Sequence, residues 1–254
     1  MLPDQGCAIS PPAVCTLIIL VRPGHSWPLV FAANRDERLD RTWDPPAAWW
    51  PERPGVIAGR DHGAGGTWMG VNRYGVVAAV LNRQGSLGPA PGKRTRGKLP
   101  LIALGAKSAR EAAQTLAAQD AGQWRSFNLV VGDATGAVFL RGLGQGRPQS
   151  QPLLPGLHMV TAHDPDDWES PRVARHLPRF GAAELPEPPR WGSWPALLAD
   201  REGAPAEQLN VVPRGGFGTV CASLLAIPAI GPISWLFAAG PPHTAPFVSV
   251  RVEE

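Results

Sequence analysis

The chain has 254 residues, of which 44% are hydrophobic and 18% are charged, and its formal net charge is +3. This composition is typical of a folded globular protein and excludes an intrinsically disordered one, while the length allows one large domain or two small ones. Three cysteines without CxxC spacing exclude a disulfide framework and a zinc knuckle, and the longest apolar stretch, residues 13–21, has about half of the roughly 20 residues that a membrane span needs.

Residues 1–14 contain two adjacent prolines and lack the basic start and apolar middle of an export signal. We expect this segment to be a non-native or removable N-terminal extension. One explanation is a leader that is cleaved off. The other is that translation truly starts at Val14, since GTG can serve as an initiation codon, and we favour this second explanation. In both cases Cys15 becomes the first residue of a single domain that covers residues 15–254.

The first half of the domain predicts strands followed by helices. Apolar runs bounded by Gly, Pro and Asn predict strands at 15–21, 29–33, 55–59, 67–72 and 76–81. The Trp- and Pro-rich segment 42–51 is expected to be irregular, and its rings either pack on the core or form an aromatic wall for a flat or apolar ligand. Helices are predicted at 99–105 and 108–121, and Ser108 with Glu111 has the spacing of a capping box.

The second half returns to strands and closes with a third group of them. Strands are predicted at 127–132, 137–141 and 157–162, helices at 171–180 and 194–201, and further strands at 219–227, 233–239 and 247–252. No segment between these elements is long and polar enough to separate two domains. The order of elements therefore predicts one layered α+β domain.

A thiol and a group of polar side chains come together if the first two strands form a hairpin. Cys15 then lies beside the strand end that carries Asn34-Arg-Asp-Glu37. If Cys15 is the first residue, its own α-amine, with a pKa of about 7.7 to 8.0, can accept the thiol proton. Asp36 would orient that amine, Arg35 would hold an anionic group or the thiolate, and Asn82 would donate its amide to a developing oxyanion.

Each of these features also has a structural explanation. Cys15 can be a buried strand cysteine, Arg35 and Asp36 an ion pair, and Asn34 the cap of a turn. The basic segment 93–98 is either a solvated loop or a contact for an anion. The basic face with interleaved aromatics that nucleic-acid binding requires does not recur along the chain, so we expect no nucleic-acid partner.

Short motifs occur in a fixed order along the chain. They are Cys15-Thr-Leu17, Ala33-Asn-Arg-Asp-Glu37, Ala58-Gly-Arg-Asp61, Gly65-Gly-Thr-Trp-Met-Gly70, Leu81-Asn-Arg83, Thr95-Arg-Gly97 and Phe127-Asn-Leu129, with a looser continuation to Gly216-Phe-Gly-Thr219. In this combination they resemble the NRDE family, the group that includes Transport and Golgi organisation protein 2. That family in turn resembles N-terminal nucleophile (Ntn) cysteine hydrolases of the choloylglycine hydrolase and acid ceramidase type.

The resemblance implies an α+β fold of the Ntn-hydrolase type, a four-layer αββα sandwich in which two mainly antiparallel sheets lie between helical layers. It implies Cys15, Asp36 and Asn82 as catalytic residues, whereas Arg35 comes from the NRDE motif. Two positions depart from the hydrolase pattern: Thr161-Ala162 stands in place of a Thr-Asn pair, and Gly218-Thr-Val-Cys221 lacks an arginine near the last sheet. A missing oxyanion amide costs about 2.7 to 4 kcal/mol, so full amidase activity requires a substitute such as His163.

NRDE relatives are connected with haem trafficking and with acyl-coenzyme A or lipid handling. The resemblance therefore implies a cytoplasmic protein that binds a large amphipathic molecule near Cys15, without stable membrane insertion. The expected ligand-binding residues are Asn34, Arg35, Asp36, Glu37, Trp68 and Arg96, and Lys93 and Arg94 would help to hold the phosphates of coenzyme A. The alternative is an Ntn-type cysteine hydrolase that cleaves an amide or thioester bond with Cys15 as nucleophile.

No resident cofactor or metal is required for either function. Haem is a possible cargo, and the sequence offers several side chains that could ligate its iron without singling out one of them. These candidates are His62, Met69, His158, His163 and Cys221.

Overall fold

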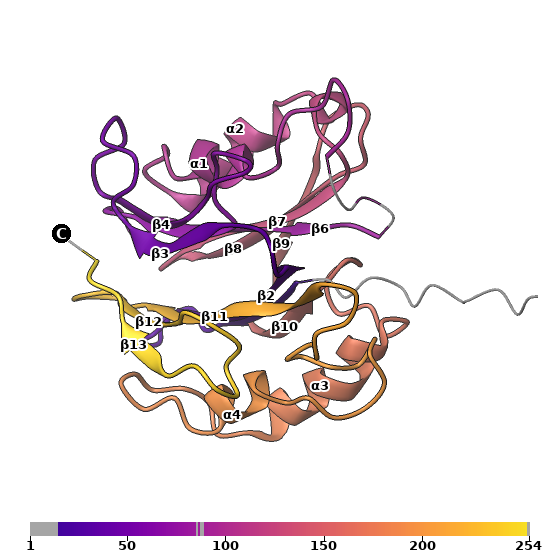
Figure 1. Ribbon diagram of the computed structural model, residues 1–254. Helices are drawn as coiled ribbons and strands as arrows, with labels where there is room; N and C mark the ends of the chain where they lie inside the picture. Colours follow the sequence, from indigo (N-terminus) through magenta and orange to yellow (C-terminus); the bar gives the residue numbers. More distant parts are fainter. Residues whose placement is uncertain (1–14, 85, 87–88, 253–254) are drawn as a thin grey trace, which may run out of the picture.

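Two antiparallel sheets lie face to face between two pairs of helices in the computed structural model of the chain (Figure 1). The structure describes residues 15–252 except 85, 87 and 88. The predicted extension, residues 1–14, lies outside the described residues. The predicted four-layer αββα sandwich is confirmed, with two sheets between helical layers.

The first sheet has six strands, and all its neighbouring strands are antiparallel. Their order across the sheet is β10 (Gly156–Val160), β1 (Thr16–Val21), β2 (Leu29–Arg38), β11 (Phe217–Ile227), β12 (Ser234–Ala238) and β13 (Phe247–Ser249). The long strands β2 and β11 pair with each other in its middle. β1 and β2 form the predicted hairpin, in which Thr16 lies opposite Asn34.

The second sheet has seven strands that follow one another in chain order, again with antiparallel pairing. They are β3 (Trp43–Ala47), β4 (Val56–Asp61), β5 (Met69–Asn72), β6 (Val77–Asn82), β7 (Phe127–Asp133), β8 (Gly136–Gly142) and β9 (Gln149–Leu153). This simple up-and-down order needs only short connections, apart from the segment between β6 and β7 that carries two helices.

Four helices cover the outer faces of the two sheets. The helices α1 (Lys98–Ala103) and α2 (Ala109–Ala117) pack on the seven-stranded sheet, and α3 (Pro171–Ala182) and α4 (Trp194–Leu198) pack on the six-stranded sheet; a 3-10 turn spans Ala121–Gln123. Three apolar layers result, one between the sheets and one beneath each pair of helices. None of the helices in the described part of the chain is long and apolar enough to cross a membrane.

Local sequence signals placed most elements, and the capping box at α2 is confirmed. Ser108 Oγ accepts a hydrogen bond from Glu111 N at 3.2 Å, so Ser108 is the N-cap, while the Glu111 carboxylate accepts from the backbone N–H of Lys107. These contacts satisfy backbone donors that a helix start leaves without intrahelical partners. The helix ends at Ala117, earlier than the predicted residue 121.

Several strands differ from their predictions: β13 ends at Ser249 rather than at residue 252, β5 begins at Met69 rather than at residue 67, and three further differences have a clear physical reason. The predicted strand 29–33 continues as β2 to Arg38, because β11 supplies backbone partners beyond Asn34, where the pairing with β1 ends, and polar residues can alternate between its faces. The segment 42–51, predicted to be irregular, contributes the edge strand β3, whose prolines coincide with a break in register. The strand β9 was not predicted, because its exposed residues carry no apolar alternation.

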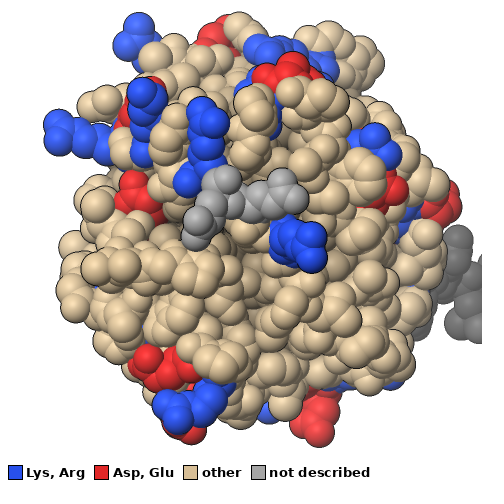
Figure 2. Space-filling view, turned by 90° about the vertical axis from the view of Figure 1, so that its left-hand side faces the viewer, with Lys and Arg blue, Asp and Glu red and all other residues tan. Residues whose placement is uncertain are grey.

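Charged side chains are spread over the face drawn in Figure 2. Lys and Arg are more numerous in its upper half, which is formed by the seven-stranded sheet and its helices, and Asp or Glu lies close to several of them. Wide uncharged areas separate these groups. This face therefore carries a mixed charge pattern, in contrast to the dense basic cleft described below.

A close approach between β4 and Trp68 requires a glycine. A methyl group on Gly59 would lie 2.3 Å from ring atoms of Trp68. We expect Gly59→Ala to lower the free energy of unfolding by about 1 to 3 kcal/mol, because the indole must move away from the positions in which it contacts Trp43 and Arg35. The control is Gly181→Ala in α3, where the added methyl would meet Leu157 at an ordinary 3.9 Å. Denaturant unfolding of both variants tests the prediction, and equal stability changes would contradict it.

Candidate active site

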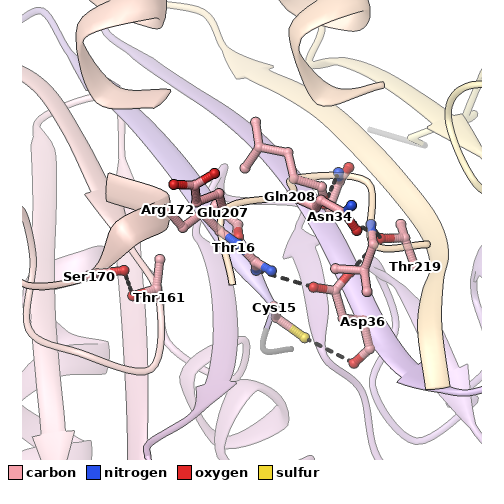
Figure 3. Close-up of polar contacts among 12 residues, drawn as sticks. Cys15, Thr16, Asn34, Asp36, Thr161, Ser170, Arg172, Glu207, Gln208 and Thr219 are labelled. Atoms are coloured by element: carbon pink, nitrogen blue, oxygen red, sulfur yellow. Dashed lines mark hydrogen bonds and ion pairs between the residues drawn. The ribbon is translucent and has the colours of Figure 1, made fainter. Parts of the chain in front are cut away.

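Cys15 lies at the end of the β1–β2 hairpin, immediately before β1. Its thiol donates a hydrogen bond to the carbonyl oxygen of Asp36 at a distance of 3.6 Å (Figure 3). Burial raises the pKa of the Cys15 thiol to about 12, and the nearby Asp36 carboxylate also raises it. At neutral pH the thiol is therefore protonated, and it needs a base before it can act as a nucleophile.

The side chain of Asp36 points to the other face of β2, toward the α3 layer, where it is completely buried. One carboxylate oxygen accepts a hydrogen bond from Thr219 Oγ1 at 2.6 Å, and the other accepts from Arg172 Nη1 at 3.2 Å. The same nitrogen of Arg172 donates to Thr16 Oγ1 at 2.8 Å. Arg172 thereby connects α3 with the two strands that carry Cys15 and Asp36.

Burial dominates the ionisation of Asp36. Loss of solvation raises the pKa of its carboxyl to about 6, although Arg172 and Thr219 act in the opposite direction. The carboxyl is therefore mostly ionised at neutral pH and gains a proton just below it. Arg172 is only 2% exposed, and its partnership with Asp36 was not predicted, since 136 residues separate the two in sequence.

Arg35 points into the space between the sheets and is held from several directions. Its Nη2 donates to Asp61 Oδ2 at 2.9 Å, Glu37 lies 3.6 Å away, and the guanidinium carbon is 4.3 Å from the centre of the Trp68 ring. The other terminal nitrogen, Nη1, is buried and has no hydrogen-bond partner among the described residues. Arg35 thus presents a fixed positive charge with one unused donor.

Two cavities adjoin Cys15 and Arg35. The larger is a cleft of about 600 Å³. Seven basic residues and three acidic ones line it, namely Arg35, Arg38, Arg41, Lys93, Arg94, Arg96, Arg125, Asp36, Glu37 and Asp61. The smaller cavity has about 20 Å³ and a mainly apolar lining between the sheets. The excess of positive charge makes the larger cleft suitable for an anionic ligand.

The cleft brings together most of the predicted site residues. Its lining includes Cys15, Arg35, Glu37, Trp68, Asn82 and Arg96, and also Asp36, whose carboxylate lies buried on the other face of β2. Asn34 lines the smaller cavity instead, and its side-chain amide donates to the carbonyl oxygens of Leu198 at 2.8 Å and Leu209 at 2.9 Å. That nitrogen supports the α4 layer and is not available to a ligand in the cleft.

Arg96 has a structural role in the wall of the cleft. Its Nη1 donates to the carbonyl oxygens of Ser86 at 2.6 Å and Ser126 at 2.9 Å, so it holds the segment before α1 against the start of β7. Burial lowers the pKa of Arg96 to about 10, which leaves the side chain charged at neutral pH. Arg96 therefore contributes both order and positive charge to the cleft.

The two segments that depart from the hydrolase pattern, Thr161-Ala162 and Gly218–Cys221, supply neither an oxyanion amide nor an arginine to the described lining of the cleft. His163 pairs with Asp167 at 3.1 Å, and it is absent from the described linings of both cavities, so it does not replace the missing amide. Ala162 is buried two residues beyond the end of β10. Thr219 donates a hydrogen bond to the Asp36 carboxylate and so helps to hold Asp36 in place. The sequence did not indicate this role.

The candidate haem ligands are dispersed. His62, His158 and His163 each pair with an aspartate, and none of the three is a described lining residue of either cavity. Met69 and Cys221 line only the 20 Å³ cavity. Among the described residues no group of three or more His, Cys, Asp or Glu is arranged to hold a metal ion.

Comparison with known proteins yields a family and a fold. The sequence model of the family described as "Transport and Golgi organisation 2" matches residues 14–181. No curated protein matches the sequence.

Three of the solved structures that match are Ntn-hydrolase-like acylases. The N-acylethanolamine-hydrolyzing acid amidase ortholog of Caenorhabditis elegans is 13% identical, with a TM-score of 0.57 over 83% of this chain and 92% of that chain. Penicillin V acylase from Agrobacterium tumefaciens is 14% identical, with a TM-score of 0.48 over 94% and 99% of the two chains. A mutant of conjugated bile acid hydrolase from Clostridium perfringens is 10% identical, with a TM-score of 0.47 over 94% and 97%. At 13% identity and a TM-score of 0.57, the likeness to the first of these structures shows the fold alone.

The buried pair of Asp36 and Arg172 predicts a large loss of stability when one partner is removed. We expect Arg172→Met to lower the free energy of unfolding by about 3 to 5 kcal/mol, because it leaves the Asp36 carboxylate buried without its cation. Adding Asp36→Asn to this variant should recover part of the loss. The control is Arg175→Met on the same helix, whose more exposed ion pairs contribute about 1 kcal/mol or less. Equal losses for Arg172→Met and Arg175→Met would contradict the prediction.

The raised pKa of Asp36 predicts a specific pH dependence of stability. The folded state, with a pKa of about 6, holds the proton more tightly than the unfolded state, with a pKa of about 3.9. Protonation therefore stabilises the fold as the pH falls through about 6 toward 4. Relative to Asp36→Asn, the unmodified protein should gain about 2 to 3 kcal/mol between pH 7 and pH 4. Urea unfolding across this range measures the difference, and a relative loss at low pH would refute a raised pKa.

Proposed function

The chain belongs to the Transport and Golgi organisation 2 family and has the fold of Ntn hydrolases, and from this premise we propose that its cleft binds a large anionic acyl derivative that Cys15 cleaves. The observation that carries the proposal is the position of Cys15 in the wall of a roughly 600 Å³ cleft whose lining is predominantly basic. A thioester or amide with a phosphate- or carboxylate-bearing portion fits this combination. Acyl-coenzyme A is the representative of that class that we favour.

The nucleophile requires a free α-amine at Cys15. With its pKa raised to about 12, the thiol does not ionise by itself, and no histidine is a described lining residue of the cleft. An α-amine on the same residue, with an ordinary pKa of about 7.7 to 8.0, can accept the proton. We therefore propose that residues 1–14 are absent from the active protein and that the Asp36 carboxylate stabilises the ammonium group so formed.

The proposed reaction has two steps. The sulfur of Cys15 attacks the carbonyl carbon while its proton passes to the α-amine, and the amine then delivers that proton to the leaving thiolate or amine. The resulting thioester on Cys15 is attacked by water, whose proton the α-amine accepts as the carboxylic acid leaves and the thiol is restored. Asn82 and the unused Nη1 of Arg35 are the groups proposed to stabilise the negative oxygen in both steps.

Haem is the other predicted cargo, and the cavities favour an acyl derivative over it. Two of the five candidate axial ligands, Met69 and Cys221, line a cavity, and its volume of about 20 Å³ excludes a porphyrin. An acyl derivative needs no axial ligand. Its anionic portion would meet Arg35, Arg94 and Arg96.

Binding without turnover is the second candidate function. It is favoured by Ala162, which stands where the hydrolases carry an oxyanion amide, because one lost donor costs about 2.7 to 4 kcal/mol of transition-state stabilisation. In that case the protein would carry the same anionic ligand and hand it on unchanged. A cytoplasmic location, in which Cys15 and Cys221 stay reduced, suits both candidates.

The dependence on the α-amine yields a direct test. We compare the 254-residue chain with a chain that begins at Cys15, using hydrolysis of acyl-coenzyme A. The shorter chain should hydrolyse the thioester, and the longer one should be at least 100-fold slower, because its Cys15 has no adjacent amine to take the proton. Intact mass of protein made from the native gene then identifies the first residue. Equal rates for the two chains would refute the amine mechanism.

Variants of the site separate turnover from binding. Cys15→Ser in the shorter chain should abolish hydrolysis with less than a threefold change in ligand affinity, because the side chains are similar in size. Asn82→Ala should lower kcat by about 100-fold with little change in KM, as expected for a donor that acts only on the oxyanion. Tight binding of acyl-coenzyme A without hydrolysis by the chain that begins at Cys15 would instead support the carrier function.

A further inference from the structure

The small cavity and the large cleft meet at the nucleophile. Four residues line both of them: Cys15, Arg35, Trp68 and Val80. A substrate with its carbonyl carbon at Cys15 can therefore extend one part into each cavity. The sizes and linings of the two cavities decide which part goes where.

The small cavity is an extension of the apolar core between the sheets. Its lining includes Leu17, Ala33, Met69, Ala79, Leu81 and Ala222. Its volume is about 20 Å³, compared with about 600 Å³ for the cleft. It therefore has room only for a short apolar group.

We propose that this small cavity selects the acyl part of the substrate and restricts it to a short apolar group such as acetyl or propionyl. The inference rests on the proposed function and assigns the large basic cleft to the anionic leaving portion. In the acylation step the bond between Cys15 Sγ and the acyl carbon forms, and the bond between that carbon and the leaving sulfur breaks. The proton of Cys15 passes to the leaving thiolate.

The opposite orientation is disfavoured by the chemistry of the leaving group. A small leaving group in the inner cavity would be an amine or a thiol, and an amine carries a charge at neutral pH once released. Its burial among apolar side chains would cost far more than burial of a methyl group. A long acyl chain in the cleft would also lie beside Arg94 and Lys93, displacing water from charges without pairing them.

A chain-length series tests the selection. Acetyl-, butyryl-, octanoyl- and palmitoyl-coenzyme A are incubated with the full chain and with the chain that begins at Cys15. Hydrolysis is followed by release of free thiol, and acylation of Cys15 by intact mass. We expect kcat/KM to fall at least tenfold from acetyl to octanoyl, because the longer chain does not fit between the sheets.

A matched pair of variants locates the selectivity in the cavity. Met69 and Val71 are both buried in β5 and face the same core, but only Met69 lines the small cavity. Met69→Ala should enlarge the cavity and reduce the preference for acetyl over octanoyl at least threefold, whereas Val71→Ala should leave that ratio unchanged. The thermal midpoints of both variants report whether they are folded.

The outcomes distinguish this inference from the proposed function. Acylation or turnover that is equal for acetyl and octanoyl thioesters, or faster for octanoyl, would overturn the short-chain inference and leave the hydrolase intact. Absence of acylation and turnover with every thioester would refute the proposed hydrolysis, and with it the inference. The series on the unmodified protein gives these answers even if Met69→Ala does not fold.

Discussion

The buried ion pair between Asp36 and Arg172 is the constraint on which the rest of the site depends. It joins a helix of the outer layer to the hairpin that carries Cys15, and Thr16 and Thr219 each form a further hydrogen bond with the pair. Desolvation of the carboxylate outweighs the attraction of the guanidinium, as the raised pKa of Asp36 indicates. The arrangement therefore costs stability in isolation, and it keeps a carboxylate ionisable near physiological pH next to the candidate nucleophile.

Arg35, on the other face of β2, likewise joins two parts of the fold through an ion pair. Asp61 and Arg41 belong to the seven-stranded side of the cleft, and the bond from Arg35 to Asp61 connects the two sheets across the opening. Trp68 lies against the guanidinium and is itself held by the close passage over Gly59. The width of the cleft is consequently set by contacts between charged and aromatic groups, and the apolar layer begins immediately below them.

Apolar alternation and caps are local signals, and they predicted most elements and a layered α+β domain, whereas the four-layer sandwich was predicted from the resemblance to the NRDE family and Ntn hydrolases. The sequence also predicted that Cys15 and the NRDE tetrad would be neighbours, since a short hairpin connects their strands. It did not predict the partner of Asp36, because a buried pair separated by 136 residues leaves no local pattern. The role of Asn34 was equally hidden, since its amide binds two backbone carbonyls rather than side chains. The two cavities depend on packing between sheets, which periodicity does not describe.

Side chains alternate between the two faces of β2, so two residues of the four-residue motif support the fold and the other two face the cleft. Asn34 and Asp36 face the α3 and α4 layer, and Arg35 and Glu37 face the cleft. A harmful substitution at Asn34 would reduce the amount of folded protein in a cell, whereas one at Glu37 would leave the amount nearly unchanged and alter only what the protein does. A chaperone or a stabilising ligand could therefore rescue a substitution at Asn34, because it restores the amount of folded protein. It could not rescue one at Glu37, because it cannot replace a missing functional group.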